Sequence, residues 1–593
     1  MRLHRSALIL LLATVAIAQT SGPPAQITEK DVAVPMRDGV VLRADVLRPA
    51  TGDRFPTLVY RTPYGKEFAL NDYTTFKHAV ERGYAVVVED VRGRYASSGE
   101  FRPYENEGRD GYDTIEWAAR QLWSNGDVGT FGLSYPGAVQ WLAAVENPPH
   151  LKAMVPAMTF STPQNFFYAG GTWDMSWIEW IWDNIAPDIR AKKNLPGPKT
   201  VADAEAAWPS AAPKMLSFLP LNQLEELRTV APYYYDWLSH PPEDFWWDWA
   251  ELRNKYGRVH AAVLNLSGWY DDNYGPEGAT TNFTGLLKSR VGTGARTHLL
   301  LGPWVHGVAS TAKTKSGERE FGPEAIIDYD EVVLRWMDHY LRGIANGEQN
   351  EKPVRYFVMG ENRWRDSDAW PPAATVTPYY LHVRGETHQG EVSETAPGSH
   401  GISTSFVSDP ATPVVNKFNA SGAHDYRDLV SRDDVLIFDS LPLANDLEIT
   451  GPIHASIFLS CNCRDLDLWV RLLDVAPDGN AFNLMGPGLD VQRASYRDLK
   501  AGRQLLTPGK VYEIQLNNLI TSNVFLKGHR IRVQISGTFF PNFSRNLQTG
   551  KSETVSATMQ KAKITIYADS KHPSRIMLPV VKRQLKTAQA DTR

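Results

Sequence analysis

The chain has 593 residues, too many for a single hydrophobic core, so roughly two to four domains are expected. With 42% apolar and 22% charged residues, its composition is ordinary for a globular protein. A net charge of −5, without a long basic run, argues against nucleic acid as a partner. The high aromatic content (18 Trp, 24 Tyr and 22 Phe) points to large packing surfaces or an aromatic-lined pocket.

The N-terminus has the pattern of a signal peptide. Arg2 and Arg5 supply positive charge, residues 7–18 are apolar, and Ala16-Ile17-Ala18 matches a cleavage motif. The apolar run is too short to span a bilayer comfortably, which makes an uncleaved anchor the weaker alternative. We therefore expect residues 1–18 to be removed and the mature protein to be periplasmic or extracellular, without a membrane segment.

Strands and helices alternate through two stretches of the chain, which we assign to one α/β domain at 25–160 and 255–350. Such alternation is typical of a parallel sheet with crossover helices. Strands are predicted at 41–46, 57–60, 84–88, 128–132, 151–158, 261–266 and 297–301, and helices at 112–122 and 326–341.

Two further regions differ from this α/β domain. Residues 161–254 are rich in Trp and Pro and mostly helical in pattern, which predicts a helical insertion. From 353 to 580 the chain has short alternating strands separated by turn residues. This pattern predicts a C-terminal β-sandwich of the jelly-roll type that begins with the strand 355–359.

Ser134 lies in the sequence Gly-Leu-Ser-Tyr-Pro-Gly at 132–137, between a predicted strand and a predicted helix. A serine on such a tight turn has an exposed hydroxyl, and the first backbone N–H groups of the helix point toward the same place. The string alone is weak evidence, because most such strings are ordinary turns. At neutral pH a serine also needs a base and an orienting carboxylate to act as a nucleophile.

An acid and a histidine follow Ser134 in the order that an α/β-hydrolase requires. The predicted strand 261–266 runs into Ser-Gly-Trp-Tyr and then Asp271, and the strand 297–301 runs into Gly-Pro-Trp-Val and then His306. Both therefore fall at the carboxyl ends of strands, where the mechanism needs them. The structural alternatives are a helix N-cap for Asp271 and a loop histidine for His306. Asp272 and His298 are the nearest competitors, but His298 begins its strand and Asp272 would point elsewhere.

The oxyanion of an acyl-transfer intermediate needs two hydrogen-bond donors. One candidate is the backbone N–H of Tyr135, the residue after the nucleophile. The other is the hydroxyl of Tyr64, in the loop after the strand 57–60. Spacing alone leaves open a second role for Tyr64, as a packing residue beside a proline turn.

Several motifs together resemble one family. R-T-P-Y-G-K, D-V-R-G-R-Y-x-S-S-G, G-L-S-Y-P-G, G-W-Y-D, G-P-W-x-H and V-R-Y-F-V-M-G-E-N-R-W-R are similar to motifs of the CocE/NonD hydrolases. That family includes cocaine esterase, X-prolyl dipeptidyl aminopeptidases, α-amino-acid ester hydrolases and glutaryl-cephalosporin acylases. The resemblance covers nearly the whole mature chain. It implies an α/β-hydrolase core with a helical cap and a C-terminal jelly roll. The sequence itself indicates no metal or organic cofactor.

The resemblance also implies a role for each candidate residue. Ser134 is the nucleophile, His306 the base and Asp271 the acid that orients it. The Tyr64 hydroxyl and the Tyr135 N–H form the oxyanion hole.

The cap supplies candidates for substrate contact: Trp173, Asp174, Trp177 and Trp180. The three tryptophans recur at spacings of four and three, which predicts one helical face, and packing of the cap against the body is the alternative. The α-amino-acid ester hydrolases carry acids just after the catalytic aspartate, where this chain has Asn273 and Tyr274. Asp174 still offers one carboxylate, but an aromatic or aliphatic acyl group suits the Trp-rich lining better than an ammonium.

The remaining unusual residues are expected to be structural. Cys461 and Cys463 predict two small buried side chains, because a bridge across one residue is strained. The aromatic run at 245–249 is expected to pack. Arg92 and Arg94 are expected to brace their loop through carboxylates.

The sequence therefore predicts an exported serine hydrolase that cleaves a small acyl ester, an amide or a short peptide through an acyl-enzyme. An X-prolyl dipeptidyl aminopeptidase is the alternative, and it needs a pocket for a free N-terminus. A carbohydrate-binding protein with an inactive hydrolase core is a third interpretation, which the intact triad argues against. The oligomeric state stays open, and a homo-oligomer is compatible with the sequence.

Overall fold

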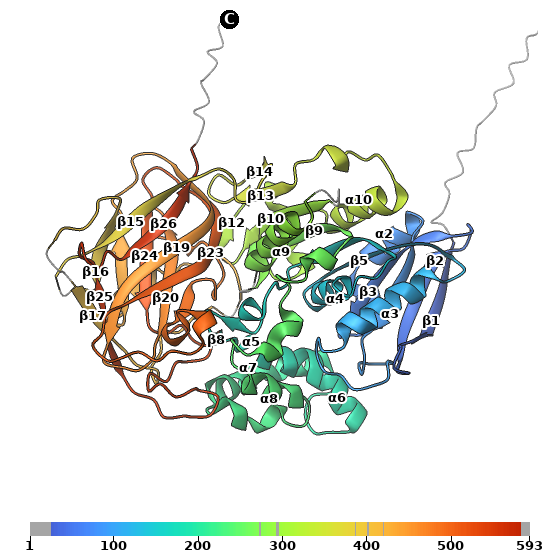
Figure 1. Ribbon diagram of the computed structural model, residues 1–593, viewed down its shortest axis with the longest axis horizontal. Coiled ribbons are helices and arrows are strands. Elements are labelled where there is room, and N and C mark those ends of the chain that lie inside the picture. The colour runs from blue at the N-terminus through green and yellow to red at the C-terminus, as the bar shows by residue number, and fades with distance from the viewer. Residues whose placement is uncertain are drawn as a thin grey trace, which may run out of the picture.

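The computed structural model describes residues 25–271, 274–291, 296–385, 387–399, 403–418 and 420–582. An α/β body and an all-β body lie side by side, and a group of helices packs below them (Figure 1). The predicted signal peptide at 1–18 lies outside the described residues.

One ten-stranded sheet forms the α/β body, in the order β1-β2-β4-β3-β5-β6-β9-β10-β13-β14. The strands from β4 to β13 in this order run parallel, whereas β1, β2 and β14 are antiparallel to their neighbours at the two edges. This sheet confirms the predicted α/β fold. The strand bounds are β1 (Gln26–Pro35), β2 (Val41–Pro49), β3 (Phe55–Thr62), β4 (Ala85–Asp90), β5 (Ser124–Leu133), β6 (Leu151–Ala157), β9 (Ala262–Tyr270), β10 (Thr297–Val305), β13 (Val354–Val358) and β14 (Arg363–Ser367).

Helices cover both faces of this sheet. Because side chains alternate along a strand, Val87 of β4 joins one core, whereas Val86 and Val88 join the other. The first core contains α3 (Glu107–Ala119), α4 (Tyr135–Ala144) and the cap, and the second contains α2 (Thr75–Glu81) and α10 (Tyr329–Arg342). The shorter helix α1 (Lys66–Asp72) follows β3, and α9 (Gly275–Ser289) packs on β9.

The cap is the segment between β6 and β9. It begins with a small hairpin and continues as a series of helices, so the predicted helical insertion is present. Trp173 lies in strand β8 and not on a helix, so the predicted single stripe of three tryptophans is wrong. Its elements are β7 (Tyr168–Ala169), β8 (Thr172–Trp173), α5 (Ser176–Trp180), a π-helical turn (Ile181–Ile185), α6 (Ala186–Lys193), α7 (Val201–Ser217) and α8 (Pro232–Ser239).

The aromatic run at 245–249 at the end of the cap packs only in part. Trp247 is buried against Phe167, with ring centroids 4.5 Å apart. Trp246 and Trp249 are half-buried and line a surface cavity of about 410 Å³, and Phe245 is 85% exposed.

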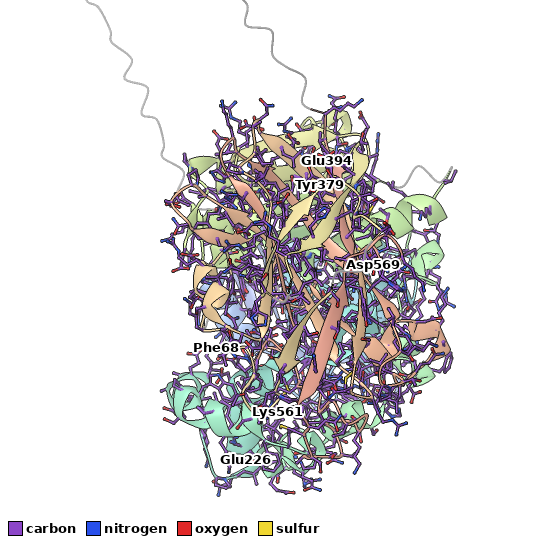
Figure 2. The ribbon with its side chains drawn as sticks, turned by 90° about the vertical axis from the view of Figure 1, so that its left-hand side faces the viewer. Phe68, Glu226, Tyr379, Glu394, Lys561 and Asp569 are labelled. Atoms are coloured by element: carbon purple, nitrogen blue, oxygen red, sulfur yellow. A yellow bond between two sulfur atoms is a disulfide. The ribbon has the colours of Figure 1, made fainter. Side chains whose placement is uncertain are left out.

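The all-β body contains a twelve-stranded hydrogen-bonded system, and its apolar core continues into β9, α9, β10 and β13 of the α/β body. Figure 2 views this body, where the Tyr379 hydroxyl donates a hydrogen bond to Glu394 at 3.1 Å. The strand bounds are β15 (Thr375–Val383), β16 (Gln389–Ser393), β17 (Ser403–Ser408), β18 (Val435–Asp439), β19 (Leu447–Cys461), β20 (Asp467–Val475), β21 (Ala481–Asn483), β22 (Val491–Arg493), β23 (Tyr512–Phe525), β24 (Arg530–Ser536), β25 (Ala562–Tyr567) and β26 (Arg575–Val580).

The predicted start of this body with the strand 355–359 is wrong. β13 runs parallel to β10, with Leu299 opposite Val354, and β14 pairs with β13. The helix α10 is therefore the crossover of one more β-α-β unit, which adds β13 to the α/β sheet. Strand pattern alone does not say which sheet a short strand joins.

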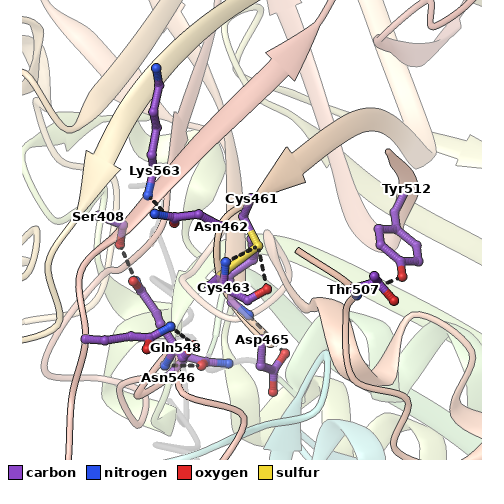
Figure 3. The surroundings of a disulfide bond; sticks show 12 residues. Ser408, Cys461, Asn462, Cys463, Asp465, Thr507, Tyr512, Asn546, Gln548 and Lys563 are labelled. Atoms are coloured by element: carbon purple, nitrogen blue, oxygen red, sulfur yellow. Dashed lines mark hydrogen bonds between the residues drawn. A yellow bond between two sulfur atoms is a disulfide. The ribbon is translucent and has the colours of Figure 1, made fainter. Parts of the chain in front are cut away.

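Cys461 and Cys463 form a disulfide, contrary to the prediction of two unbonded side chains. The end of β19 bends here, which brings the two Cα atoms to 5.3 Å, within the range that a disulfide allows. Both side chains are buried. The intervening Asn462 accepts a hydrogen bond from the backbone N–H of Lys563 at 2.8 Å (Figure 3).

Candidate active site

Ser134 occupies the turn between β5 and α4. Its φ of 67° is in the left-handed region, which is uncommon for a residue with a side chain and marks a strained turn. Two glycines make the turn possible. A Cβ on Gly132 would lie 2.5 Å from the Cβ of Pro136, and a Cβ on Gly137 would lie 2.7 Å from the carbonyl oxygen of Ala157. The strand, the turn and the helix thus place Ser134 at the carboxyl end of the sheet, as predicted.

Asp271 and His306 follow the neighbouring strands β9 and β10, and the structure brings their side chains together. The Nδ1 atom of His306 lies 2.6 Å from Oδ1 of Asp271. The other carboxylate oxygen, Oδ2, accepts a hydrogen bond from the hydroxyl of Ser267 at 2.9 Å. Because a carboxylate only accepts, Nδ1 carries the proton and Nε2 is left with its lone pair. Asp271 is fully buried, so its orientation is fixed by these two partners.

His298, the competing histidine named from the sequence, does not share this arrangement. His298 lies at the beginning of β10, and its Nδ1 is 2.9 Å from a carboxylate oxygen of Glu348. It is therefore at the opposite end of the strand from His306. Asp272 and Asn273 lie outside the described residues.

Tyr64 lies in the loop after β3, beside Ser134. Its hydroxyl oxygen accepts a hydrogen bond from the indole N–H of Trp180 at 3.0 Å. Burial raises the pKa of Tyr64 to about 12, although hydrogen bonds with Trp180 and Ser134 act in the opposite direction. The phenol is therefore protonated at neutral pH and keeps a proton to donate.

Tyr135 is the first residue of α4, where backbone N–H groups have no partner within the helix. Its phenol is buried and donates a hydrogen bond to Glu107 at 2.8 Å, away from the role predicted for its N–H. The side chain therefore anchors the start of α4. The backbone N–H of Tyr135, and not its phenol, is the candidate donor to an oxyanion.

Ser134 and His306 line the same cavity of about 310 Å³. Its other walls are largely aromatic, and the ring of Tyr274 meets the imidazole of His306 edge-on at 5.9 Å. Sequence analysis identified Trp177 and Trp180 among these residues but not the carboxylates. The remaining lining residues are Tyr104, Tyr135, Thr159, Phe166, Ser176, Trp177, Glu179, Trp180, Asp183, Asn184 and Tyr274.

The cavity contains two carboxylates that the sequence analysis missed, Glu179 and Asp183. They are four residues apart on the cap, from α5 into the π-helical turn, a spacing that places two side chains on one face. Burial, together with the charges of Glu179 and Glu205, raises the pKa of Asp183 to about 7. Oδ1 of Asp183 is buried without a hydrogen-bond partner in the described structure. The sequence signal that could have identified them is the i, i+4 spacing of Glu179 and Asp183 around Trp180.

Trp173 and Asp174, also predicted to contact substrate, are not among the residues that line this cavity. Trp173 lines a separate cavity between the cap and the all-β body, and its backbone N–H donates to Ser544. The Asp174 carboxylate accepts a hydrogen bond from the backbone N–H of Ser176 at 2.8 Å.

Arg92 and Arg94 were both predicted to pair with carboxylates, but their partners differ in kind. Arg92 pairs with the carboxylates of Asp38 and Asp110, as expected. Arg94 is fully buried and donates mainly to backbone carbonyls, with Asp188 at 3.4 Å as its carboxylate.

Neither a membrane span nor a metal site is found in the described ranges. Among these residues no helix is both long and apolar enough to cross a bilayer. In the same part of the chain, no group of three or more His, Cys, Asp or Glu side chains is arranged to hold a metal ion.

The chain is similar to known hydrolases and peptidases over most of its length. The pattern of the X-Pro dipeptidyl-peptidase (S15 family) matches residues 38–308, and that of the X-Pro dipeptidyl-peptidase C-terminal non-catalytic domain matches 346–577. Cocaine esterase of a Rhodococcus species is 34% identical over 93% of this chain and 98% of its own length. A protein of Streptomyces avermitilis, provisionally named an Xaa-Pro dipeptidyl-peptidase, is 22% identical over 83% of this chain and 76% of its own.

Among solved structures, an α-amino acid ester hydrolase superposes with a TM-score of 0.80. The match covers 96% of this chain and 99% of that chain at 23% identity. At that identity the likeness supports the fold: an α/β-hydrolase with a helical cap and an all-β C-terminal body.

Proposed function

The chain belongs to the CocE/NonD hydrolase family, and we propose that it is a serine hydrolase that cleaves carboxylic esters or amides through an acyl-enzyme. One observation carries the proposal. Ser134 and His306 line the same cavity, and His306 is held at 2.6 Å by the buried carboxylate of Asp271. That a relative is named cocaine esterase supports ester cleavage as the reaction type.

In the proposed reaction, the Ser134 hydroxyl attacks the substrate carbonyl carbon while Nε2 of His306 takes its proton. The negative charge that develops on the carbonyl oxygen receives hydrogen bonds from the Tyr64 hydroxyl and the Tyr135 N–H. The tetrahedral intermediate collapses, and the leaving alcohol or amine takes the proton from His306. Water then attacks the acyl-serine in the same way and releases the acid. Asp271 stabilises the imidazolium throughout.

We propose that the substrate carries an aromatic or alkyl group, because Trp177, Trp180 and Phe166 form much of the cavity wall. Glu179 and Asp183 add negative charge to the same wall, which favours a positively charged group over an anionic one. The residues Asn273 and Tyr274 had favoured an aromatic or aliphatic acyl group over an ammonium, and the two carboxylates in the wall now support the ammonium as well. A peptide with a free N-terminus satisfies the same charge, so the X-prolyl dipeptidyl-peptidase alternative stays open.

Substitution of the nucleophile tests the proposal. We expect Ser134→Ala to abolish turnover of p-nitrophenyl esters and to prevent labelling by a serine-directed phosphonate, because both reactions form a bond to the serine oxygen. Mass spectrometry of the labelled wild type should place the adduct on the peptide that contains Ser134. Ester turnover by the Ser134→Ala variant at the wild-type rate would contradict the proposal.

A substrate panel separates the esterase from the peptidase. Purified protein is assayed with simple acyl esters, a β-lactam amide and Gly-Pro-anilide. Faster turnover of the esters by kcat/KM supports the proposed function, whereas a preference for Gly-Pro-anilide supports the alternative.

The remaining assignments accompany this proposal. We propose export after cleavage behind residue 18, a hydrolase domain at 25–160 and 255–350, and a cap at 161–254. We propose a C-terminal domain at 353–580, whose first two strands, β13 and β14, pair with the α/β sheet. Small acyl esters, amides or short peptides are the proposed substrates, and the size of any homo-oligomer is to be measured by light scattering.

A further inference from the structure

The indole N–H of Trp180 donates a hydrogen bond to Tyr64, one of the two proposed oxyanion donors. Trp180 is the last residue of α5 in the cap, whereas Tyr64 belongs to the α/β body. The indole Nε1 lies 3.0 Å from the Tyr64 hydroxyl oxygen. The indole ring also stacks on the ring of Tyr135, with centroids 6.2 Å apart and planes 10° apart. One cap side chain therefore contacts both residues of the proposed oxyanion hole.

The direction of this hydrogen bond has a chemical consequence. An indole N–H is only a donor, so the Tyr64 oxygen must accept. The indole N–H cannot accept, so the single proton of the Tyr64 hydroxyl is left to donate elsewhere, on the side where Ser134 is also within hydrogen-bonding reach. Donation to a hydroxyl oxygen also polarises its O–H bond and strengthens it as a donor.

We propose that Trp180 is a positioning residue for catalysis: its indole N–H orients the Tyr64 hydroxyl so that the proton of that hydroxyl points to the oxyanion. Trp180 acts through Tyr64 and not on the reacting atoms. The cap thus completes the oxyanion hole in addition to covering the cavity. This inference rests on the proposed function, which makes Tyr64 an oxyanion donor.

A buried arginine holds the two partners at this distance. The Arg94 guanidinium donates to the carbonyl of Pro63, directly before Tyr64, at 2.8 Å. It also donates to the carbonyls of Asn184 and Ile185, in the turn that follows Trp180, at 3.0 and 2.9 Å. Arg94 is fully buried, so these bonds are shielded from water. The Tyr64 loop and the Trp180 segment are therefore fastened to each other by one side chain.

The test removes the N–H and keeps an aromatic ring. Trp180→Phe retains a ring against Tyr135 but cannot donate to Tyr64. We expect kcat for a p-nitrophenyl ester at saturation to fall about five- to tenfold, the size of one neutral hydrogen bond, whereas the smaller ring in the cavity wall affects KM separately. In a Tyr64→Phe background the same substitution should change kcat less than twofold, because the hydroxyl through which Trp180 acts is gone. A role in substrate binding alone would raise KM instead.

Trp182→Phe is the matched control. Its indole N–H donates within the cap, to the carbonyl of Ala204 at 3.1 Å, and the residue does not line the catalytic cavity. We expect its kcat to stay within twofold of wild type. A similar loss of kcat in both tryptophan variants would show a general effect of cap packing and overturn the inference.

The two proposals fail in different ways. If Tyr64→Phe lowers kcat but Trp180→Phe does not, the oxyanion role of Tyr64 stands and the role of Trp180 is refuted. If neither variant lowers kcat, the oxyanion assignment itself fails, and the role of Trp180 fails with it. Should Trp180→Phe not fold, Arg94→Lys provides a second route, because a single ammonium cannot span the three carbonyls. The same loss of kcat at unchanged KM, absent in the Tyr64→Phe background, is then expected.

Discussion

Replacement of Asp271 by asparagine should reverse the tautomer of His306. In the native structure Oδ1 accepts from His306 Nδ1 at 2.6 Å and Oδ2 accepts from the Ser267 hydroxyl at 2.9 Å. If the amide oxygen of asparagine keeps the bond from Ser267, its NH₂ group faces Nδ1. Nδ1 must then accept, the imidazole proton moves to Nε2, and Nε2 loses the lone pair that takes the proton from Ser134.

The expected loss in kcat is about 10⁴-fold, as for the same substitution in other serine hydrolases, or about 5 kcal/mol of transition-state stabilisation. Because asparagine has the size and shape of aspartate, the fold should be retained. The assay is ester hydrolysis under saturating substrate, with circular dichroism and thermal melting of the same preparation. A folded Asp271→Asn variant that loses less than tenfold in kcat would refute Asp271 as the group that orients His306.

Two further substitutions test the walls of the site. A Cβ on Gly275 would lie 1.9 Å from Oδ2 of Asp271, so Gly275→Ala should displace that carboxylate and lower kcat at least tenfold in the ester assay. The control is Gly257→Ala, which should not lower kcat, because a Cβ there meets nothing within 4 Å. The raised pKa of Asp183, about 7, means that its carboxyl is neutral below pH 7 and charged above it. The kcat/KM ratio of a choline ester to its neutral 3,3-dimethylbutyl isostere should therefore rise about tenfold from pH 6 to pH 8 in the wild type and stay flat in Asp183→Asn. The protonation of His306 affects both esters equally and cancels in that ratio, so an identical rise in the variant would exclude Asp183 as the source of the charge preference.

The sequence by itself determined where the chemistry can lie in the chain. Local periodicity and glycine placement put Ser134 between a buried strand and a helix. They also put Asp271 and His306 after later strands. In a parallel sheet the carboxyl ends of strands meet at one edge, so residues far apart in the chain were expected to converge there. The pairing of His306 with Asp271 in the structure follows this rule.

Tertiary structure decided everything that depends on which segments pack against each other. Glu179 and Asp183 line the cavity and Trp173 and Asp174 do not, although all four lie within eleven residues of sequence. β13 joined the α/β sheet because the crossover helix α10 brings it beside β10, a contact that no strand pattern specifies. Likewise, the bond from Trp180 to Tyr64 joins two elements 116 residues apart. Local sequence fixes the conformation of a turn or a strand, but a contact between distant elements is set by how the whole chain buries its apolar faces.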